Sequence, residues 1–403
     1  MSTTPRVRAG LASLAAAYFV SGTGSLAIVG LLDPMSQAFD VTRTQVAQLV
    51  TVFALTFAFA APLLQVAFGN RSRRRLVIVG LLTMAAAALA TVFAPSFEWA
   101  LAARIVMALG AAAIGPVASA LGASLVAPQD QAKALASVFA GLTVSTVLGV
   151  PLSSWLGHVL SWQSVFVVFA VVAVLCAFAV ARVVRDDSAG TAPTLRALAG
   201  VFERASTAWA LSATLFQMGA QFATYTLVAL LMTEHFHLQA SWISLALFLF
   251  GVGGIAGNAI AGAVGDRVNT DRLLFGALAA LVVAFVALTV APPWPWLALA
   301  LGTGWALVGL MFQAPQQKRL VELAPSQRGL LLAMNASAIY FGMSLGSYVG
   351  ARVHAGWGAG AMPLASIVLA LAAAGALALS RRAAAREKET CAQLRLAAAQ
   401  AGS

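Results

Sequence analysis

Twelve separate runs of roughly twenty apolar residues restrict the possible fold more than any other feature of this sequence. They cover residues 9–32, 45–68, 76–94, 97–118, 134–157, 162–181, 207–231, 240–264, 272–291, 295–316, 329–352 and 361–380. A helix needs about 20 apolar residues to cross the hydrocarbon core of a bilayer. Only 9% of the chain is charged, against about 25% in a soluble globular protein. We therefore predict an all-α membrane protein with twelve transmembrane helices, and we exclude a soluble or disordered chain.

The positions of the basic residues predict how these helices are oriented. Lys and Arg accumulate in short loops on the cytoplasmic side of a membrane. With a cytoplasmic N-terminus, all Lys and Arg residues lie inside except Arg43 and Arg352, which lie outside, and Arg104, which lies in the fourth run. Both termini are therefore expected in the cytoplasm. The net charge of +11 then reflects topology and contact with anionic membrane lipid, so we expect no nucleic-acid partner.

The chain also contains an internal duplication with a nearly constant offset. Asn70-Arg71 after the second run corresponds to Asp266-Arg267 after the eighth. The small residues at every fourth position of the fifth run, Gly141, Ser145, Gly149 and Ser153, correspond to Ala338, Gly342, Gly346 and Gly350 of the eleventh run, 197 residues later. This offset predicts two pseudo-symmetric six-helix bundles in parallel orientation. The expected units are an N-terminal bundle (1–184), a cytoplasmic linker (185–206), a C-terminal bundle (207–382) and a cytoplasmic tail (383–403).

Short motifs in this pattern resemble the major facilitator superfamily, whose transporters consist of two parallel six-helix halves. The family's signature Gly-x-x-x-Asp-Arg-x-Gly-Arg-Arg has a degenerate copy at residues 66–75, with Asn70 in place of Asp, and a better copy at residues 262–267. Residues 104–110 resemble the family's fourth-span pattern Arg-x-x-Gln-Gly-x-Gly, and residues 145–151 resemble its fifth-span antiporter pattern. Over residues 9–380 the chain is similar to the 12-span bacterial branch of drug and sugar efflux proteins, which are proton antiporters.

The resemblance implies a secondary transporter of the bacterial inner membrane that exports a small organic compound by alternating access. The expected substrate is a drug-like molecule, a sugar or a nucleoside-type metabolite, and the expected coupling ion is the proton. An uptake symporter or uniporter is the alternative within this class. A transport-dead membrane sensor or assembly factor on the same scaffold is the alternative from another class. We expect no enzymatic activity, cofactor or metal, because the sequence has no P-loop, nucleophile triad or metal-ligand cluster. We also expect a monomer.

Two charged residues are the candidates for proton coupling. Arg104 lies within a span, where a charge is costly and usually faces a partner or a wet cavity. Asp33 ends the first span on the same side and is able to bind a proton if burial favours its neutral form. Because Arg104 enters the fourth span from the same side, we expect the two to be neighbours, and the resemblance implies an acidic residue in the first span for coupling. The alternatives are a snorkelling arginine and an exposed loop carboxylate.

The candidate substrate cavity is defined by polar and aromatic residues of the spans that line it in the resembled family. Gln217, Gln221 and Tyr225 share one face of the seventh span. Weaker candidates are Asn335, Gln313, Trp305, Tyr18 and Ser21. Hydrogen bonding between helices is the alternative interpretation.

Three further sets of residues have expected roles. The resemblance places Asn70, Arg71, Asp266 and Arg267 in a cytoplasmic gate, in which the uncharged Asn70 leaves the Asp266-Arg267 pair dominant. Close helix packing is expected at Gly141, Gly149, Pro151, Gly342, Gly346 and Gly350. The histidines His158, His235, His237 and His354 fall in outer loops or at helix ends, where we expect exposed side chains.

Overall fold

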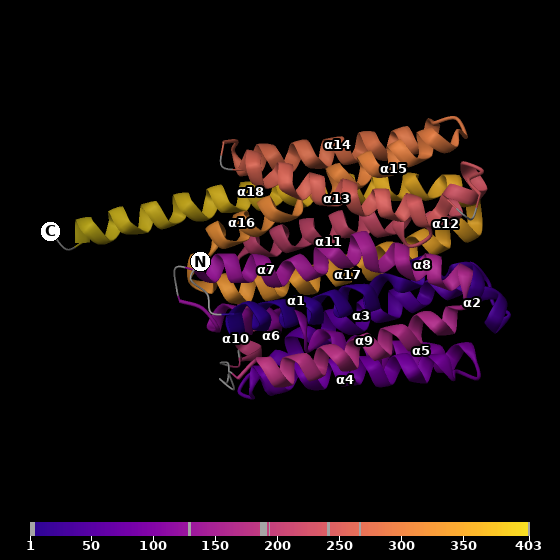
Figure 1. Cartoon of the computed structure of the whole chain (residues 1–403). Coiled ribbons are helices and arrows are strands. Elements are labelled where there is room, and N and C mark those ends of the chain that lie inside the picture. The colour runs from indigo at the N-terminus through magenta and orange to yellow at the C-terminus, as the bar shows by residue number, and fades with distance from the viewer. Residues whose placement is uncertain are drawn as a thin grey trace.

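The computed structural model describes residues 5–127, 130–185, 192, 194–239, 242–265 and 267–401. These residues form a bundle of long helices that run along a common direction, and no strand occurs within these ranges (Figure 1). Eleven helices are long and apolar enough to cross a membrane. The pair Ala205–Tyr225 and Val228–His235, bent by 46°, makes a twelfth span when counted as one. The predicted all-α fold with twelve membrane-spanning helices is confirmed.

The first half of the chain forms the lower part of Figure 1. Its helices are α1 (Pro5–Leu26), η1 (Ala27–Gly30), α2 (Leu32–Phe39), α3 (Arg43–Phe68), α4 (Arg73–Val92), α5 (Phe97–Ala112), α6 (Gly115–Ser124), α7 (Gln131–Val144), η3 (Ser145–Gly149), α8 (Val150–Val159) and α9 (Trp162–Val183). Hydroxyl caps start several of them: the side chain of Ser96 accepts a hydrogen bond from the Trp99 amide at the start of α5. A π-turn, η3, divides the fifth span just before Pro151, which has no amide hydrogen to donate to the helix.

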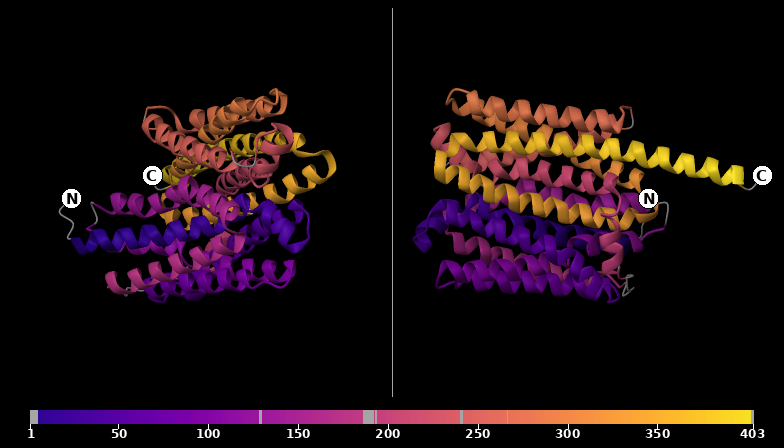
Figure 2. Two further views of the ribbon diagram at one scale, coloured as in Figure 1. Left: turned by 45° about the vertical axis from the view of Figure 1, so that its right-hand side comes forward. Right: turned by 180° about the vertical axis from the view of Figure 1, so that it is seen from behind.

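A short helix, α10 (Leu195–Gly200), precedes the second half. That half contains α11 (Ala205–Tyr225), α12 (Val228–Leu230), η4 (Leu231–His235), α13 (Ile243–Gly265), α14 (Thr270–Val290), α15 (Pro295–Leu310), α16 (Gln313–Leu323), η6 (Pro325–Gln327), α17 (Arg328–Trp357), η7 (Ala359–Ala361) and α18 (Met362–Ala401). Residues 186–191 and Pro193 of the expected linker lie outside the described ranges, and the predicted unit boundaries stay predictions. The last helix continues well past the bundle, so the expected tail is helical (Figure 2).

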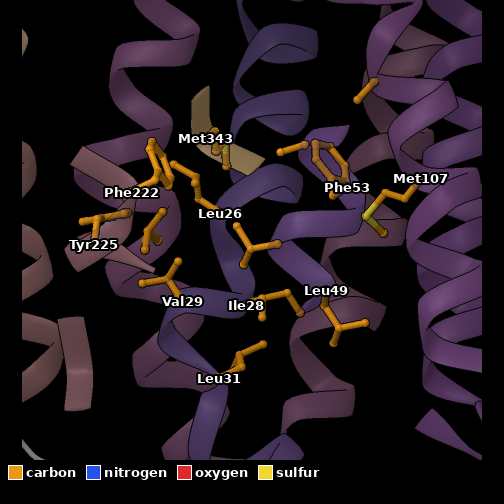
Figure 3. Close-up of a cluster of buried hydrophobic side chains, with 14 of the residues drawn as sticks. Leu26, Ile28, Val29, Leu31, Leu49, Phe53, Met107, Phe222, Tyr225 and Met343 are labelled. Carbon is orange, nitrogen blue, oxygen red and sulfur yellow. The ribbon is translucent and has the colours of Figure 1, made fainter. Parts of the chain in front are cut away.

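Both chain termini lie at the same end of the bundle, which we call the terminal end, and α2 and α12 lie at the opposite, distal end (Figures 1 and 2). The two halves meet along two helix pairs, α3 with α17 and α8 with α13. Near the middle of the molecule, Phe222 of α11 and Met343 of α17 lie beside Leu26 of the first half (Figure 3). Buried apolar side chains therefore continue across the boundary between the halves.

The small-residue stripes let helix backbones approach closely within each half. A Cβ atom added to Gly342, Gly346 or Gly350 of α17 would overlap the carbonyl of Leu215, Gly219 or Ala223 of α11 in turn. In the first half, Gly141 faces the Ala15 carbonyl and Gly149 faces the Thr23 hydroxyl. Pro151 is buried in the same fifth span. The fifth span thus lies against the first as the eleventh lies against the seventh.

Candidate functional site

Arg104 is fully buried between three helices of the first half. Its Nη1 donates to the Gly24 carbonyl at 2.7 Å, its Nη2 to the Ser25 carbonyl at 3.1 Å and its Nε to the Leu49 carbonyl at 3.3 Å. The guanidinium carbon lies 4.6 Å from the centre of the Phe53 ring. Each of the three guanidinium nitrogens therefore donates to a main-chain carbonyl, and none of these partners is a carboxylate.

The end of α1 explains why main-chain carbonyls are free to accept these bonds. Gly24 and Ser25 lie in the last turn of α1, where the chain narrows into the 3₁₀ turn η1. The last carbonyls of an α-helix have no partner within the helix, and the negative end of its dipole favours a cation. Arg104 accordingly caps α1, and snorkelling to the interface does not describe it.

Asp33 lies apart from these contacts, in the first turn of α2 at the distal end. Its carboxylate forms an ion pair with Arg43, the first residue of α3. Within the described residues, the structure thus gives Asp33 and Arg104 separate polar partners and does not bring the two together. The order of the apolar runs could not reveal this, because α2 turns away as a separate helix after η1.

The glutamines of α11 form a neutral network with the tenth span. The Gln217 amide donates to the Gly309 carbonyl at 2.9 Å, and Gln313 donates to the Gln217 side-chain oxygen at 2.9 Å. The indole N–H of Trp305 donates to the side-chain oxygen of Gln221. The structure therefore brings together four of the predicted cavity residues, and in this conformation they bond to one another.

Aromatic rings extend this network. The Tyr225 ring centre lies 4.6 Å from that of Phe250 and 6.3 Å from that of Trp305, and the Phe250 and Trp305 centres lie 4.8 Å apart. Trp305 is fully buried and Tyr225 is nearly so. The result is a buried cluster of amide and aromatic groups without formal charge, which would form a wall of a substrate cavity if the halves separated here.

Asn335 belongs to a separate polar cluster that the sequence pattern identified only in part. Its side-chain oxygen accepts a 2.8 Å hydrogen bond from Thr214, and Gln316 donates to Thr214 at 3.1 Å. Gln316 is fully buried, and its side-chain oxygen has no hydrogen-bond partner among the residues that the structure describes. Gln316 follows Gln313 by three residues and so lies on the same helix face, and this spacing could have identified Gln316 from the sequence.

Tyr18 and Ser21, the candidates of the first span, lie on α1. Tyr18 is half-buried with its ring edge-on to Phe139 at 5.2 Å, and Ser21 is buried. Sequence reasoning missed Tyr340, which reaches from α17 across to the first half and stacks on Phe57 with ring centres 3.7 Å apart. The chain has only four tyrosines, so a tyrosine within a span was itself a signal.

The expected cytoplasmic gate is only partly visible. Asn70 is exposed and accepts a 3.1 Å hydrogen bond from the Ala192 amide, and Arg71 and Arg267 are exposed. Asp266 lies outside the described residues. The predicted dominance of the Asp266-Arg267 pair stays a prediction.

Charged side chains join the two halves at the distal end. Arg43 of the first half lies 3.3 Å from Oε1 of Glu234 in η4, and Thr44 lies 3.2 Å from Nδ1 of His354 in α17. The other imidazole nitrogen, Nε2, lies 3.1 Å from Oε2 of Glu234. Further hydrogen bonds between the halves join Ser154 to Ser244 and Thr51 to Ser347. The distal end of the bundle is therefore closed.

Two of the four histidines differ from the expectation of exposed loop side chains. His158 and His237 are exposed, as expected, whereas His235 and His354 are partly buried. The side chain of His354 is only 16% exposed. The expectation was wrong for these two because His354 lies within the eleventh helix and bonds to Glu234, and because His235 lies beside Gly360 of η7.

Comparison with known proteins gives one consistent result. The model of the Major Facilitator Superfamily matches residues 14–226 and 209–399. The inner membrane transport protein YdhP of Escherichia coli (strain K12) is 27% identical over 89% of this chain and 92% of its own length. A chloramphenicol resistance protein of Streptomyces lividans is 32% identical over 74% of this chain and 75% of its own length. Among solved structures, a bacterial homologue of the human lysosomal transporter Spinster, in an inward-facing and unoccupied conformation, aligns with a TM-score of 0.74 at 15% identity, covering 95% of this chain and 98% of the other.

Proposed function

Because the chain belongs to the Major Facilitator Superfamily, a family of secondary transporters and not of enzymes, we propose that it exports a small organic compound in exchange for protons. Alternating access is the expected mechanism, with the two halves rocking about a central site. The similarity to a resistance protein supports export of a drug-like molecule. Sugars and nucleoside-type metabolites are the other candidate substrates.

The contrast in charge between the two sides of the centre is the observation that supports this substrate class best. Arg104 is a fully buried cation on the side of the first half, and its partners include main-chain carbonyls and the Phe53 ring. The opposite wall, with Gln217, Gln221, Trp305 and Tyr225, carries no charge. Amide and aromatic groups suit a compound with hydroxyl, amide or ring groups, and they disfavour a multiply charged one.

The side on which protons enter depends on orientation. With both termini in the cytoplasm, as the positions of the basic residues predict, the distal end faces the outside of a bacterial inner membrane. A reporter that is active only outside the membrane should stay silent when fused after Ser403. Activity of that fusion would reverse the assignment of the two ends.

The test of coupling uses purified protein in proteoliposomes with an imposed pH gradient. A thermal-shift screen first identifies a compound that stabilises the wild type, since a ligand of the folded state raises stability by mass action. We expect Asp33→Asn to abolish gradient-driven accumulation of that compound and to keep its binding and its energy-independent exchange. Asp40→Asn is the matched control, because Asp40 ends the same helix and is exposed.

The outcomes separate the proposal from its rivals. Full gradient-driven flux in Asp33→Asn would remove Asp33 from the coupling mechanism. Accumulation in the direction of the proton gradient would support the uptake symporter. Binding without flux of any kind in the wild type would support a sensor.

A further inference from the structure

We propose that Glu234 and His354 form a proton-binding site that controls the closed distal end, so that acid favours the opening of that end. The proposal rests on the alternating access included in the proposed function, but not on the substrate or the direction of transport. The site is distinct from Arg104 and from the substrate wall.

Both ring nitrogens of His354 have a hydrogen-bond partner, and the imidazole can carry either one proton or two in this position. Nε2 of His354 lies 3.1 Å from the Glu234 carboxylate, and Nδ1 lies 3.2 Å from the Thr44 hydroxyl. A neutral imidazole has one N–H and one acceptor nitrogen, so it donates to Glu234 and accepts from Thr44. A protonated imidazole donates to both. Both charge states therefore fit the same positions, which allows the pair to take up a proton without losing a contact.

The charges around this pair belong to both halves. Arg43 pairs with Asp33 in the first half and with Glu234 in the second. Two carboxylates thus share one guanidinium, and a proton on the imidazole makes the whole cluster neutral. Histidine is the side chain that ordinarily changes charge between about pH 5 and 8.

The other titratable groups near this pair lie on the surrounding helices. The Asp40 side chain at the end of α2 and the Arg352 side chain on α17 are exposed. Arg352 precedes His354 by two residues and therefore projects from a different face of the helix. His235 follows Glu234, packs on the Phe236 ring with centres 4.8 Å apart and lies beside Gly360. Arg43 of the first half, unlike these groups, bonds directly to Glu234 of the pair.

Opening of the distal end changes the surroundings of the two ion pairs unequally. Asp33 and Arg43 both belong to the first half, so they move together and their contact is kept. Glu234 and His354 both belong to the second half, so they stay together but lose Arg43. Arg43, which bonds directly to Glu234, is then withdrawn together with Asp33, whose carboxylate bonds to Arg43 and not to the pair, so this carboxylate offsets only part of the effect of the cation. The open state consequently binds a proton more tightly than the closed state, and by linkage a lower pH shifts the population toward the open state.

The test measures the distance across the distal end as a function of pH. Nitroxide labels at Ala38→Cys and Ala355→Cys, two exposed positions on α2 and α17, report the separation of the halves in a background that carries Cys176→Ser and Cys391→Ser. Between pH 8 and pH 5 we expect the ratio of open to closed molecules to rise about twofold, less than the roughly fivefold that withdrawal of one lone charge from about 4 Å in water would give, because Asp33 leaves with Arg43. The rate of alkylation of a single cysteine at Ala355 by a membrane-impermeant maleimide should rise with it.

Three variants assign the effect to its residues. His354→Gln keeps a side chain that can donate to Glu234 and accept from Thr44 but never becomes charged, so its distance distribution should not depend on pH. Arg43→Gln removes the cation that distinguishes the two states, so the distal end should be more open at both pH values and respond little to pH. His158→Gln is the control, because His158 is an exposed histidine at the same end, and it should behave as the wild type does.

Each contrary result has a definite meaning. A wild-type distribution that is constant from pH 8 to pH 5, or one that closes in acid, would overturn the proposal. A pH response that persists in His354→Gln would place the proton elsewhere. If Arg43→Gln at pH 5 also stays fully closed, then alternating access at this end fails, and with it the proposed function.

Discussion

The link between the first and fourth spans differs in kind from the link between the seventh and tenth spans. In the first half, the charged Arg104 of α5 donates to main-chain carbonyls of α1. In the second half, Trp305 of α15 donates to the Gln221 side chain of α11. Gly24, an acceptor for Arg104, and Gln221 lie 197 residues apart, which is the offset of the duplication. The same position of the repeat thus supports a buried cation on one side and a neutral amide on the other.

The difference shows that the two halves of a duplicated fold can carry different groups, a buried cation in the first half and neutral hydrogen-bonding groups in the second. A cation within a membrane needs several partners, and the end of α1 supplies two carbonyls at the position where the helix stops. Neutral amides and indoles need fewer partners, so they can exchange bonds with a ligand at a lower cost. We therefore expect transport to be much more sensitive to changes at Arg104 than to changes in the glutamine network.

Replacement of Arg104 is expected to have the largest effect. Arg104→Ala leaves the carbonyls of Gly24, Ser25 and Leu49 without their charged donor, and a hydrogen bond to a charged group contributes about 1.5–3 kcal/mol. Part of this loss is offset because a buried charge is also removed. Gradient-driven flux in proteoliposomes should fall at least about tenfold, since 1.4 kcal/mol corresponds to a factor of ten. Arg104→Lys should restore only part of it, because lysine lacks the planar fork.

The matched change in the second half is Gln221→Ala, for which we expect a decrease in flux of about twofold to threefold, the size expected for one lost interhelical hydrogen bond of about 0.6 kcal/mol. Equal losses in the two variants would break the comparison. They would show that both links serve the same mechanical purpose.

Substitutions in the small-residue stripes should have an intermediate effect that is similar in the two halves. An added Cβ at Gly350 would overlap the Ala223 carbonyl, and one at Gly141 would overlap the Ala15 carbonyl. Overpacking of this kind costs about 1–3 kcal/mol. Unfolding of Gly350→Ala and Gly141→Ala in detergent should show losses of this size. Gly262→Ala is the control, since nothing lies within 4 Å of its added Cβ, and a loss there would undermine the packing argument.

Most of the fold was predictable because span length and spacing of small residues are properties of single helices. The twelve apolar runs correspond to the helices, although the seventh is bent after Tyr225. The contacts between spans were harder to predict from the sequence. Arg104 was identified as a buried charge, but its carbonyl partners depend on where α1 stops, and no side-chain pattern encodes that position.

The pairing at the distal end was the hardest part to predict. Asp33 was expected beside Arg104 and lies instead against Arg43, because α2 forms a separate short helix after η1. Arg43 was assigned only to an outer loop, and His354 to an exposed helix end. Their contact with Glu234 joins residues 191 and 120 positions apart. The contact of Arg43 with Glu234 depends on how the two halves close, and that of His354 with Glu234 depends on how distant segments of the second half pack. The local sequence specifies neither.

The smallest expected effect is that of the hydrogen bond between Trp305 and Gln221, and a double-mutant cycle isolates it. Trp305→Phe keeps an aromatic ring against Phe250 and Phe285 but removes the indole N–H. Gln221→Leu removes the acceptor and keeps a side chain of similar length. Interhelical hydrogen bonds in membrane proteins contribute about 0.6 kcal/mol on average, so the two substitutions together should destabilise the protein by about that much less than the sum of their separate effects. Pairing Trp305→Phe with Gln313→Leu provides the control, because Gln313 bonds to Gln217 and not to Trp305. A coupling energy near zero in the first cycle would show that the neutral network contributes only its shape. A value of several kcal/mol would show that this link is as strong as the link through Arg104, and the contrast between the halves would be lost.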